Sequence, residues 1–388
     1  MKVLLIAHAC QVSHEGQQRA EQLGRLPNID LRVIVPNRWY ECGKWRRCDE
    51  PFNVPYVFQA EKVRWPWAGP AQWYLHHYPR LGETLHSFKP DIINLWEEAW
   101  GLVSAHTCWL RNRILPSAKI VSETEANIDR THPFPFAQLR RYTLRNTDYA
   151  ITRQTEGIGV LRAKGYTGPV EVVGNAVNAD LFRPMDRALC KRRLGLSGFV
   201  IGYVGRFIEA KGLTEILEAL ALCPMDVNVL FVGSGPFEGA LKAQIEGMGL
   251  NGRARFLAPQ PMEALPEIMN AMDALVLVSR TTATWKEQFG RVIIEAHACG
   301  TPVIGSDSGG IPEIVGEAGV IVPERNSAAL AGAINRLRDR PEMGAELGRL
   351  GRRQVEDRFT WQGVAARMRD VYFGLLGPQR ENDARCTV

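Results

Sequence analysis

The sequence predicts an α/β protein built from two doubly wound parallel sheets. Short β-branched runs alternate with helix-length amphipathic stretches along the chain, which is typical of parallel strands joined by crossover helices. The length of 388 residues exceeds that of one typical core and indicates two or three domains. Because both halves carry a similar set of strand candidates, we predict two similar domains.

The strand candidates divide evenly between the two halves. In the first half they are 3–7, 31–35, 92–95, 120–121, 149–152 and 170–173. In the second half they are 200–204, 227–232, 255–257, 274–278, 303–304 and 320–322. The stretch 174–184 (GNAVNADLFRP) has turn chemistry and no periodicity, so we expect the domain junction there.

The composition is that of a soluble globular protein. Hydrophobic residues make up 45%, charged residues 23%, and the net charge of +5 permits an anionic ligand without indicating nucleic acid. No apolar stretch reaches the ~18–20 residues that span a bilayer, and the first apolar run has no cleavage site behind it. We therefore expect a cytoplasmic protein. The eight cysteines form no C-x-x-C pair, which indicates reduced thiols rather than a zinc site.

The segment 285–300 (WKEQFGRVIIEAHACG) holds the main candidate site. It lies between two apolar runs, so it is the loop and helix of a strand–helix–strand unit, at the sheet edge where ligands bind. Gly290 lets the backbone approach a ligand, and the helix that follows offers N–H groups to an anion. Glu287 in the loop and Glu295 in the helix flank that anion site. This layout suits a nucleotide sugar, which has phosphates in the middle and hydroxyls at both ends.

A second loop of similar character follows the strand candidate 200–204 and reads GRFIEAKGL. Gly205 and Arg206 begin it, and Lys211 lies near its end. Arginine offers a planar fork to phosphate oxygens, while lysine supplies a mobile point charge. Alone, such a pair is more often solvated. Beside the amides of residues 289–292, however, the two cations could neutralise a diphosphate.

Tryptophan is concentrated in the first half, where eight of the ten lie between positions 39 and 109. Basic residues are interleaved among the first of them. One interpretation is an aromatic core with solvated loops. The other, equally weighted, is an acceptor platform, because sugars stack on aromatic faces and basic side chains attract anionic head groups. Base stacking is disfavoured because no module that binds single strands accompanies the tryptophans.

Taken together, VGRFIEAKGL, VGSGP and WKEQFGRVIIEAHACGTPVIGSDSGGIPEIV resemble the retaining glycosyltransferases of family 4. The linker GNAVNADLFRP and the final RFTWQGVAARMRDVYFGLL are also similar to that family, so the match covers about 170–375 and is weaker before it. The resemblance implies the GT-B fold, with two Rossmann-like domains facing a cleft. An acceptor-binding domain would cover 1–173, completed by a C-terminal helix at 366–388, and a donor-binding domain 174–365.

The resemblance also implies roles for individual residues. Glu295 would bind the donor's ribose hydroxyls, and Glu287 a hydroxyl of the donor sugar. Arg206 and Lys211, in the loop begun by Gly205, would bind the diphosphate. Gly233 would lie near the base. Backbone amides that contact sugar and diphosphate would come from Gln288, Phe289, Gly290, Arg291 and Val292.

The chemistry of the bond to be broken agrees with these roles. Cleaving a glycosyl–phosphate bond puts charge on the leaving oxygen, and preorganised cations and amides stabilise such charge. Arg206 and Lys211 are therefore catalytic candidates of the second half, and Glu287 joins them through the sugar contact that the resemblance implies. No metal is then required beside these cations, and no D-x-D pair that would hold one is apparent. A glycosidase carboxylate pair is disfavoured because Glu295, inside the helix, is too far displaced from Glu287.

The first half departs from the family in two places. Where members carry a Gly-Gly pair, this chain has only Gly16, with Gln17, as the best match for a loop that closes over the donor. Where many members have a histidine that touches the transferred sugar, DIINLWEEAWG places Trp96, Glu97 and Glu98. One of these glutamates, with Glu98 as the catalytic candidate, would orient the sugar or accept a proton. Equally, one of them would cap the following helix.

Two further groups lie at predicted strand ends in the first half. The segment ETEANIDRTHPFPF could line the acceptor site through Glu125 and Asn127. His8 and His14 lie near the end of the first strand, where a lone loop histidine is usually solvated.

The predicted function is retaining transfer of a hexose from a UDP- or GDP-sugar to a hydroxyl acceptor, a glycan, a glycolipid or a polysaccharide precursor. No cofactor is needed beyond the nucleotide sugar, and no nucleic acid is involved. A lipid-linked acceptor would bring the protein to the inner face of the membrane. The alternatives are an epimerase or phosphorylase of the same architecture, or a non-catalytic sugar-nucleotide-binding protein.

Overall fold

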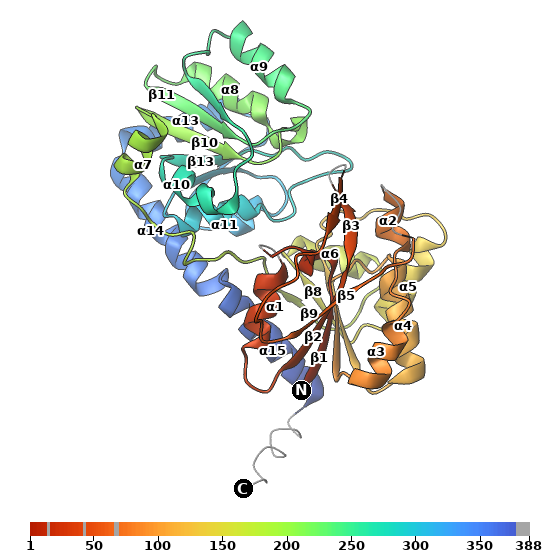
Figure 1. Ribbon diagram of the computed structural model, residues 1–388. Coiled ribbons are helices and arrows are strands. Elements are labelled where there is room, and N and C mark those ends of the chain that lie inside the picture. The colour runs from red at the N-terminus through yellow and green to blue at the C-terminus, as the bar shows by residue number, and fades with distance from the viewer. Residues whose placement is uncertain (14–15, 42–43, 66–69, 378–388) are drawn as a thin grey trace. The chain divides into compact units, whose positions relative to one another are not determined.

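The computed structural model describes residues 1–13, 16–41, 44–65 and 70–377, and it divides into two compact units (Figure 1). The first unit contains Met1–Val173 together with helix α15 (Trp361–Leu376), and the second contains Gly174–Thr360. The residue 365/366 boundary expected from the sequence falls inside α15.

The first unit is built on a seven-stranded parallel sheet with the order β5-β2-β1-β6-β7-β8-β9. Its strands are β1 (Lys2–Ile6), β2 (Asp30–Pro36), β5 (Val57–Glu61), β6 (Ile92–Leu95), β7 (Lys119–Thr124), β8 (Tyr149–Thr152) and β9 (Val170–Val172). Val3 of β1 lies beside Leu31 on one side and Ile92 on the other. The strand order therefore reverses between β1 and β6, and such a switch point is where open α/β sheets bind ligands.

Helices cover both faces of this sheet (Figure 1). Helix α1 (Gly16–Gly24) packs with α15 on one face, and α3 (Leu81–Phe88) and α4 (Leu102–Ile114) cover the other. On that second face, Leu4 and Ile6 of β1 share a core with Leu85 of α3 and Val103 of α4. The remaining elements are the 3-10 turn η1 (His8–Gln11), α2 (Pro70–Leu75), α5 (Phe136–Arg145), α6 (Glu156–Ala163) and an antiparallel hairpin of β3 (Arg38–Glu41) and β4 (Lys44–Arg47).

The second unit has a six-stranded parallel sheet with the order β12-β11-β10-β13-β14-β15. Its strands are β10 (Phe199–Val204), β11 (Val227–Val232), β12 (Ala254–Leu257), β13 (Ala274–Leu277), β14 (Val303–Ser306) and β15 (Gly319–Val322). The order reverses between β10 and β13, as in dinucleotide-binding sheets.

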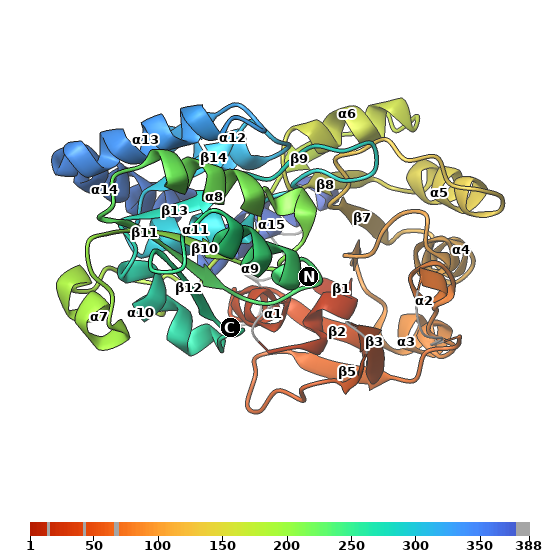
Figure 2. The ribbon, with the colours of Figure 1, turned by 90° about the horizontal axis from the view of Figure 1, so that it is seen from above.

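The helices of the second unit form two layers (Figures 1 and 2). Helices α8 (Leu213–Leu222), α9 (Glu238–Gly247) and α13 (Ser327–Asp339) form one layer, and α7 (Arg187–Leu194), α10 (Leu265–Asn270), α11 (Arg291–Ala298) and α14 (Pro341–Arg358) form the other. Shorter pieces are η2 (Glu209–Lys211), η3 (Met262–Ala264) and α12 (Ile311–Val315).

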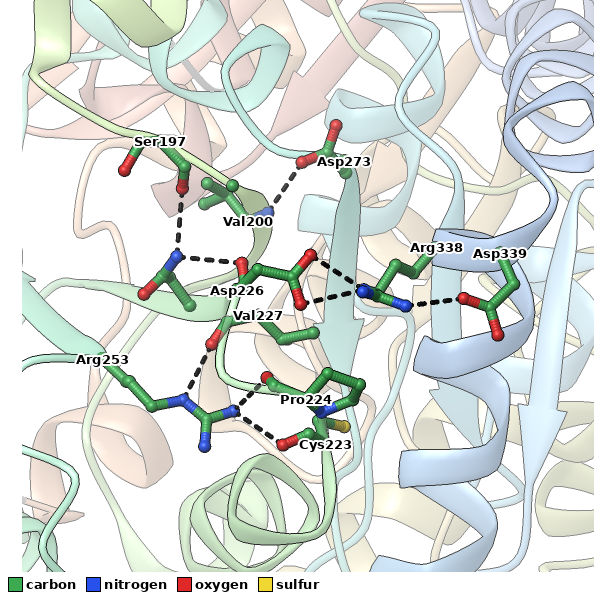
Figure 3. A network of polar contacts seen from close by, with 12 residues as sticks. Ser197, Val200, Cys223, Pro224, Asp226, Val227, Arg253, Asp273, Arg338 and Asp339 are labelled. Atoms are coloured by element: carbon green, nitrogen blue, oxygen red, sulfur yellow. Dashed lines mark hydrogen bonds and ion pairs between the residues drawn. The ribbon is translucent and has the colours of Figure 1, made fainter.

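A polar network holds the amino-terminal edge of the second sheet (Figure 3). Arg253 donates to the carbonyl oxygens of Val227, Cys223 and Pro224, at the start of β11. Asp226 pairs with Arg338 of α13 at 2.9 Å, and Asp273 accepts the N–H of Val200 at 2.7 Å. These contacts fasten the strand starts to one another. The loops that carry the candidate site residues lie at the opposite, carboxyl edge.

All twelve predicted strands are confirmed, three of them with the same bounds: β6, β8 and β11. The sequence did not predict β5, because this edge strand (VFQAE) has no apolar run longer than two residues. It also did not predict the hairpin β3–β4, whose basic and aromatic residues gave no strand period.

Candidate functional site

In the second unit the candidate residues lie on two loops at the switch point between β10 and β13. The loops are tied together, because the N–H of Arg280 donates to the carbonyl oxygen of Ala210 at 2.7 Å. Gly212 has φ +70°, and a Cβ there would lie 2.0 Å from the carbonyl oxygen of Val278. Only glycine allows this approach, which holds Lys211 against the loop that follows β13.

Lys211 and Glu287 form an ion pair across these loops. Lys211 Nζ lies 2.5 Å from Glu287 Oε2, and the hydroxyl of Ser279 donates to the same oxygen at 2.9 Å. The two charged side chains are 17% and 11% exposed, so water screens them only weakly. The Lys211 ammonium also lies 5.0 Å from the ring centre of Trp285. The lysine predicted to bind diphosphate and the glutamate predicted to bind the sugar are thus joined in one ion pair.

Helix α11 begins beside this pair. Its N-cap, Gly290, has φ +73° and no side chain, so it does not cap the first backbone N–H groups of the helix. Glu295 follows one turn later and is partly buried. Its carboxylate makes no hydrogen bond or ion pair with any described residue. Burial raises the pKa of Glu295, although nearby Arg291 opposes that effect. A partly buried carboxylate of this kind is suited to accept two neighbouring hydroxyls.

The other predicted donor residues differ in what they offer. The exposed Arg206 side chain makes no ion pair within the described chain, while its carbonyl oxygen accepts from the hydroxyl of Tyr203 at 2.8 Å. Gln288 is exposed and Arg291 lies at the start of α11 with Val292. Phe289 is 3% exposed and packs against Phe359, so its side chain anchors the loop and only its backbone can reach a ligand.

Gly205 and Gly233 bring two strand ends together. Their φ angles are +151° and +140°, and a Cβ on Gly233 would lie 2.0 Å from the carbonyl oxygen of Gly205. Their glycine character is therefore required by backbone packing, whatever they contribute to a ligand.

In the first unit the switch point between β1 and β6 holds Glu97 and His8. Glu97 Oε1 accepts the backbone N–H of His8 at 2.6 Å, and Oε2 lies 2.8 Å from His8 Nδ1. The Glu97 side chain is 3% exposed, and His76 Nε2 lies 3.8 Å from it. Burial alone would raise the pKa of Glu97, but the charge and hydrogen bonds of His8 outweigh burial and lower it. The sequence did not indicate this pairing.

Glu98 is held by the end of the next strand, β7. Its carboxylate accepts from the hydroxyl of Thr124 at 2.9 Å and from the N–H of Glu125 at 3.0 Å. Burial nevertheless raises the pKa of Glu98 to about 6. The capping hypothesis is wrong for both glutamates, since Gly101 is the N-cap of α4 and makes no side-chain cap.

A buried ionic cluster lies beneath this edge and was not predicted. Glu123 of β7 accepts from Arg19 of α1 at 2.8 Å and from Arg153, just after β8, at 2.5 Å. Burial disfavours the carboxylate, but the two guanidinium groups hold the pKa of Glu123 at about 2. Both arginines face the ring of Trp96, at 4.3 and 5.1 Å from its centre. Trp96 is thus part of a cationic cluster.

The remaining first-unit candidates have structural partners. A Cβ on Gly16 would lie 2.7 Å from the backbone of Ala9 and Cys10, so α1 begins in tight contact with η1. The Gln17 amide donates to the carbonyl oxygen of Asp49 at 2.6 Å. Glu125 lies 3.6 Å from Arg153 Nε, and Asn127 is buried. His14 lies outside the described residues.

The tryptophans divide between the two interpretations. Trp39 is 1% exposed and belongs to the core, whereas Trp45, Trp65 and Trp109 are 45%, 40% and 42% exposed. On the hairpin, Arg38 lies 4.8 Å from the ring centre of Trp45. Within the described ranges no helix is long and apolar enough to cross a bilayer. The same residues contain no group of three or more His, Cys, Asp or Glu placed to hold a metal ion.

Known proteins resemble the chain over almost its whole length. A family model described as glycosyl transferases group 1 matches residues 190–354. A D-inositol 3-phosphate glycosyltransferase of Streptomyces avermitilis is 33% identical over 397 aligned positions, covering 96% of this chain and 81% of the relative. Its counterpart in Rhodococcus erythropolis is 28% identical, with 96% and 86% covered.

Solved structures agree on the fold. Sucrose-phosphate synthase from Thermosynechococcus elongatus superposes with a TM-score of 0.72 at 24% identity, covering 97% of this chain and 99% of that one. The Anabaena protein HepE in complex with UDP gives 0.72 at 20% identity, with 96% and 99% covered. These structures establish the GT-B fold of two Rossmann-like units. The S. avermitilis relative, 33% identical over almost the whole chain, shows that the chain belongs to the group 1 glycosyltransferases.

Proposed function

We propose that the protein is a retaining hexosyltransferase that uses a nucleoside diphosphate sugar as donor and a hydroxyl group as acceptor. The observation that carries this proposal is the arrangement at the β10/β13 switch point. There, one cation, one buried carboxylate, a helix start and a second carboxylate follow one another over two adjoining loops.

Each part of a nucleotide sugar has a counterpart in this arrangement. Glu295 accepts the ribose hydroxyls, since its partly buried carboxylate has no donor among the described residues. The diphosphate is neutralised by Lys211, the exposed Arg206 and the first amides of α11. Glu287 accepts a hydroxyl of the sugar through its carboxylate, which Lys211 and Ser279 hold in place. The donor site therefore belongs to the second unit, and the acceptor to the first.

The same groups explain the chemistry. When the bond between the anomeric carbon and the phosphate oxygen breaks, the electron pair stays on the diphosphate. Lys211, Arg206 and the α11 amides stabilise that charge, commonly the largest contribution to catalysis. The acceptor oxygen forms its bond on the face that the diphosphate leaves, and its proton passes to a diphosphate oxygen. The configuration at the anomeric carbon is retained, and this chain's own cations stabilise the leaving diphosphate.

Known relatives narrow the choice of substrates. HepE has been solved with UDP and with UDP-glucose, which favours a uridine donor. The relatives named for D-inositol 3-phosphate favour a polyhydroxylated ring as acceptor. A glycan or a lipid-linked sugar shares that chemistry, and a lipid-linked acceptor would bring the protein to the cytoplasmic face of a membrane.

The test is a donor and acceptor screen. UDP-, GDP- and ADP-sugars are incubated with D-inositol 3-phosphate, free hexoses and lipid-linked oligosaccharides, and nucleotide release is followed. We expect release that depends on an acceptor, and a product with the donor's anomeric configuration by NMR. Inertness toward every donor would refute the proposal. An isomerised donor without an acceptor would show an epimerase, and release that requires free phosphate a phosphorylase.

A further inference from the structure

At the switch point of the first sheet, the buried carboxylate of Glu97 holds the imidazole ring of His8, which reaches solvent. His8 follows β1 and Glu97 follows β6, the two strands between which the sheet order reverses. His8 is 23% exposed, whereas Glu97 is 3% exposed and the neighbouring His76 is 1% exposed. The carboxylate is thus buried and the imidazole is the part of the group that reaches solvent.

We propose that His8 binds a hydroxyl of the acceptor through Nε2, and that Glu97 is the positioning residue that sets the tautomer of His8. This inference rests on the proposed function, since it names the first-unit residue that meets the acceptor.

The tautomer follows from the hydrogen bonds of Glu97. An ionised carboxylate only accepts, so the Nδ1 atom that lies 2.8 Å from Oε2 carries a proton. In the neutral ring Nε2 is then the nitrogen with the lone pair, and it accepts a hydrogen bond from a hydroxyl. The other oxygen of Glu97 accepts the backbone N–H of the same residue at 2.6 Å. The carboxylate therefore fixes the backbone and the ring of His8 together.

The surroundings hold the ring in place. His8 stacks on Trp39 at a centroid distance of 5.5 Å and meets the edge of Trp73 at 4.7 Å. Among the described residues, the titratable groups shown to interact with it are Glu97 and His76. His76 Nδ1 donates to the carbonyl oxygen of Gln72 at 3.0 Å, and burial lowers its pKa, so it remains neutral beside the carboxylate. The two tryptophan rings and the buried carboxylate thus fix the orientation of the His8 ring.

The Glu97→Gln variant tests this assignment because it reverses the polarity of the ring. The introduced amide must accept the backbone N–H of His8 through its oxygen, which turns its NH₂ group toward Nδ1. His8 then carries its proton on Nε2, and that atom becomes a donor. The ¹⁵N resonances of the ring distinguish the two tautomers in the full chain and require no activity. We expect the Nδ1–H form in the native protein and the Nε2–H form in the variant.

Binding is tested by adding D-glucose and D-inositol 3-phosphate separately to the UDP-saturated protein. We expect at least one of them to shift the His8 Nε2 resonance in the native protein. In assays with the acceptor found in the screen, Glu97→Gln and His8→Phe should raise the acceptor KM by about 10–100-fold, the loss of one or two polar contacts. The UDP affinity and the donor KM should stay unchanged. His86→Phe is the matched control, because His86 is exposed on α3 and, among the described residues, bonds within its own helix at 3.1 Å.

The outcomes separate this inference from the proposed function. Failure of UDP and GDP to bind would overturn the donor site while leaving the tautomer result to be judged alone. An Nε2–H tautomer in the native protein would overturn the role of Glu97. No shift by either probe, or equal effects of His8→Phe and His86→Phe on the acceptor KM, would overturn the role of His8. Phenylalanine preserves the ring between Trp39 and Trp73, so His8→Phe remains informative if the Glu97 variant does not fold.

Discussion

Replacing Lys211 by methionine should slow turnover far more than it weakens nucleotide binding. The substitution keeps the approximate length of the side chain and removes one charge from a site where that charge is 17% exposed. Two unit charges about 4 Å apart interact by about 4 kcal/mol at an effective dielectric constant of about 20. Removing one preorganised electrophilic group from an enzyme costs about 2.7–4 kcal/mol, or about 10²–10³ in turnover. The two estimates agree, so we expect a loss of that size.

The pairing with Glu287 adds a second effect that a double variant can separate. Without Lys211, the Glu287 carboxylate keeps its bond from Ser279, at 2.9 Å, and repels the diphosphate. Lys211→Met combined with Glu287→Gln should therefore lose less than the sum of the two single losses, since the repelling charge is gone. Strict additivity would show that the two residues act independently.

The assay is acceptor-dependent UDP release, with UDP affinity measured separately by calorimetry. Lys242→Met is the control, because Lys242 is a 55% exposed lysine of the same unit whose ion pair lies within its own helix. It should change turnover by less than about twofold, as surface ion pairs do. If Lys211→Met keeps more than a third of the native turnover, its charge does not stabilise the leaving group.

Four further outcomes are expected. Glu295→Ala should weaken UDP binding by about 10–100-fold in calorimetry but leave the affinity for 2′,3′-dideoxy-UDP unchanged, because its carboxylate accepts the ribose hydroxyls; equal losses for both ligands would contradict this. Glu123→Gln should lower the free energy of unfolding by about 3–5 kcal/mol in urea titrations, since two buried guanidinium groups lose their anion. Burial raises the pKa of Glu98 from 4.5 to about 6, so the folded protein binds this proton more tightly than the unfolded chain does. The free energy of unfolding should therefore fall by about 2 kcal/mol as the pH rises through that interval. Glu98→Gln should abolish that slope, and an unchanged slope would exclude Glu98 as its source. Gly212→Ala should cost more stability and turnover than Gly249→Ala, since both have φ near +70° but only the first meets a backbone oxygen.

Local patterns were sufficient to predict the strands, the helix start at Gly290 and the loop positions of Glu287 and Lys211. Each of these depends on a few neighbouring residues: an apolar run, a glycine, then helical spacing. The resemblance added roles to those positions. The edge strand β5 was not predicted because it is short and has no apolar run longer than two residues.

The contacts between candidates could not be predicted, because they join residues far apart in the chain. Lys211 and Glu287 are 76 positions apart, His8 and Glu97 are 89, and Arg19 and Glu123 are 104. Each pair meets only because the sheet order places particular strands side by side. The sequence showed that β1 and β6 are strands but not that they are neighbours. His8 was accordingly interpreted as a solvated loop residue, although a buried glutamate holds both its backbone and its ring.

The ion pair at the second switch point gives donor binding a specific physical requirement. In the structure, Glu287 neutralises Lys211, so an arriving diphosphate first meets the exposed Arg206 and the start of α11. To reach Lys211 it must share the ammonium with Glu287, and the shared ammonium can donate to both anions because it carries three N–H groups. Sharing the ammonium weakens its hold on Glu287, whose carboxylate then accepts a sugar hydroxyl while Ser279 keeps it in place. Diphosphate binding and sugar binding should therefore be coupled, with UDP-glucose bound more tightly than UDP in the native protein. In Glu287→Gln that preference should vanish, and its survival would show that Glu287 only holds Lys211.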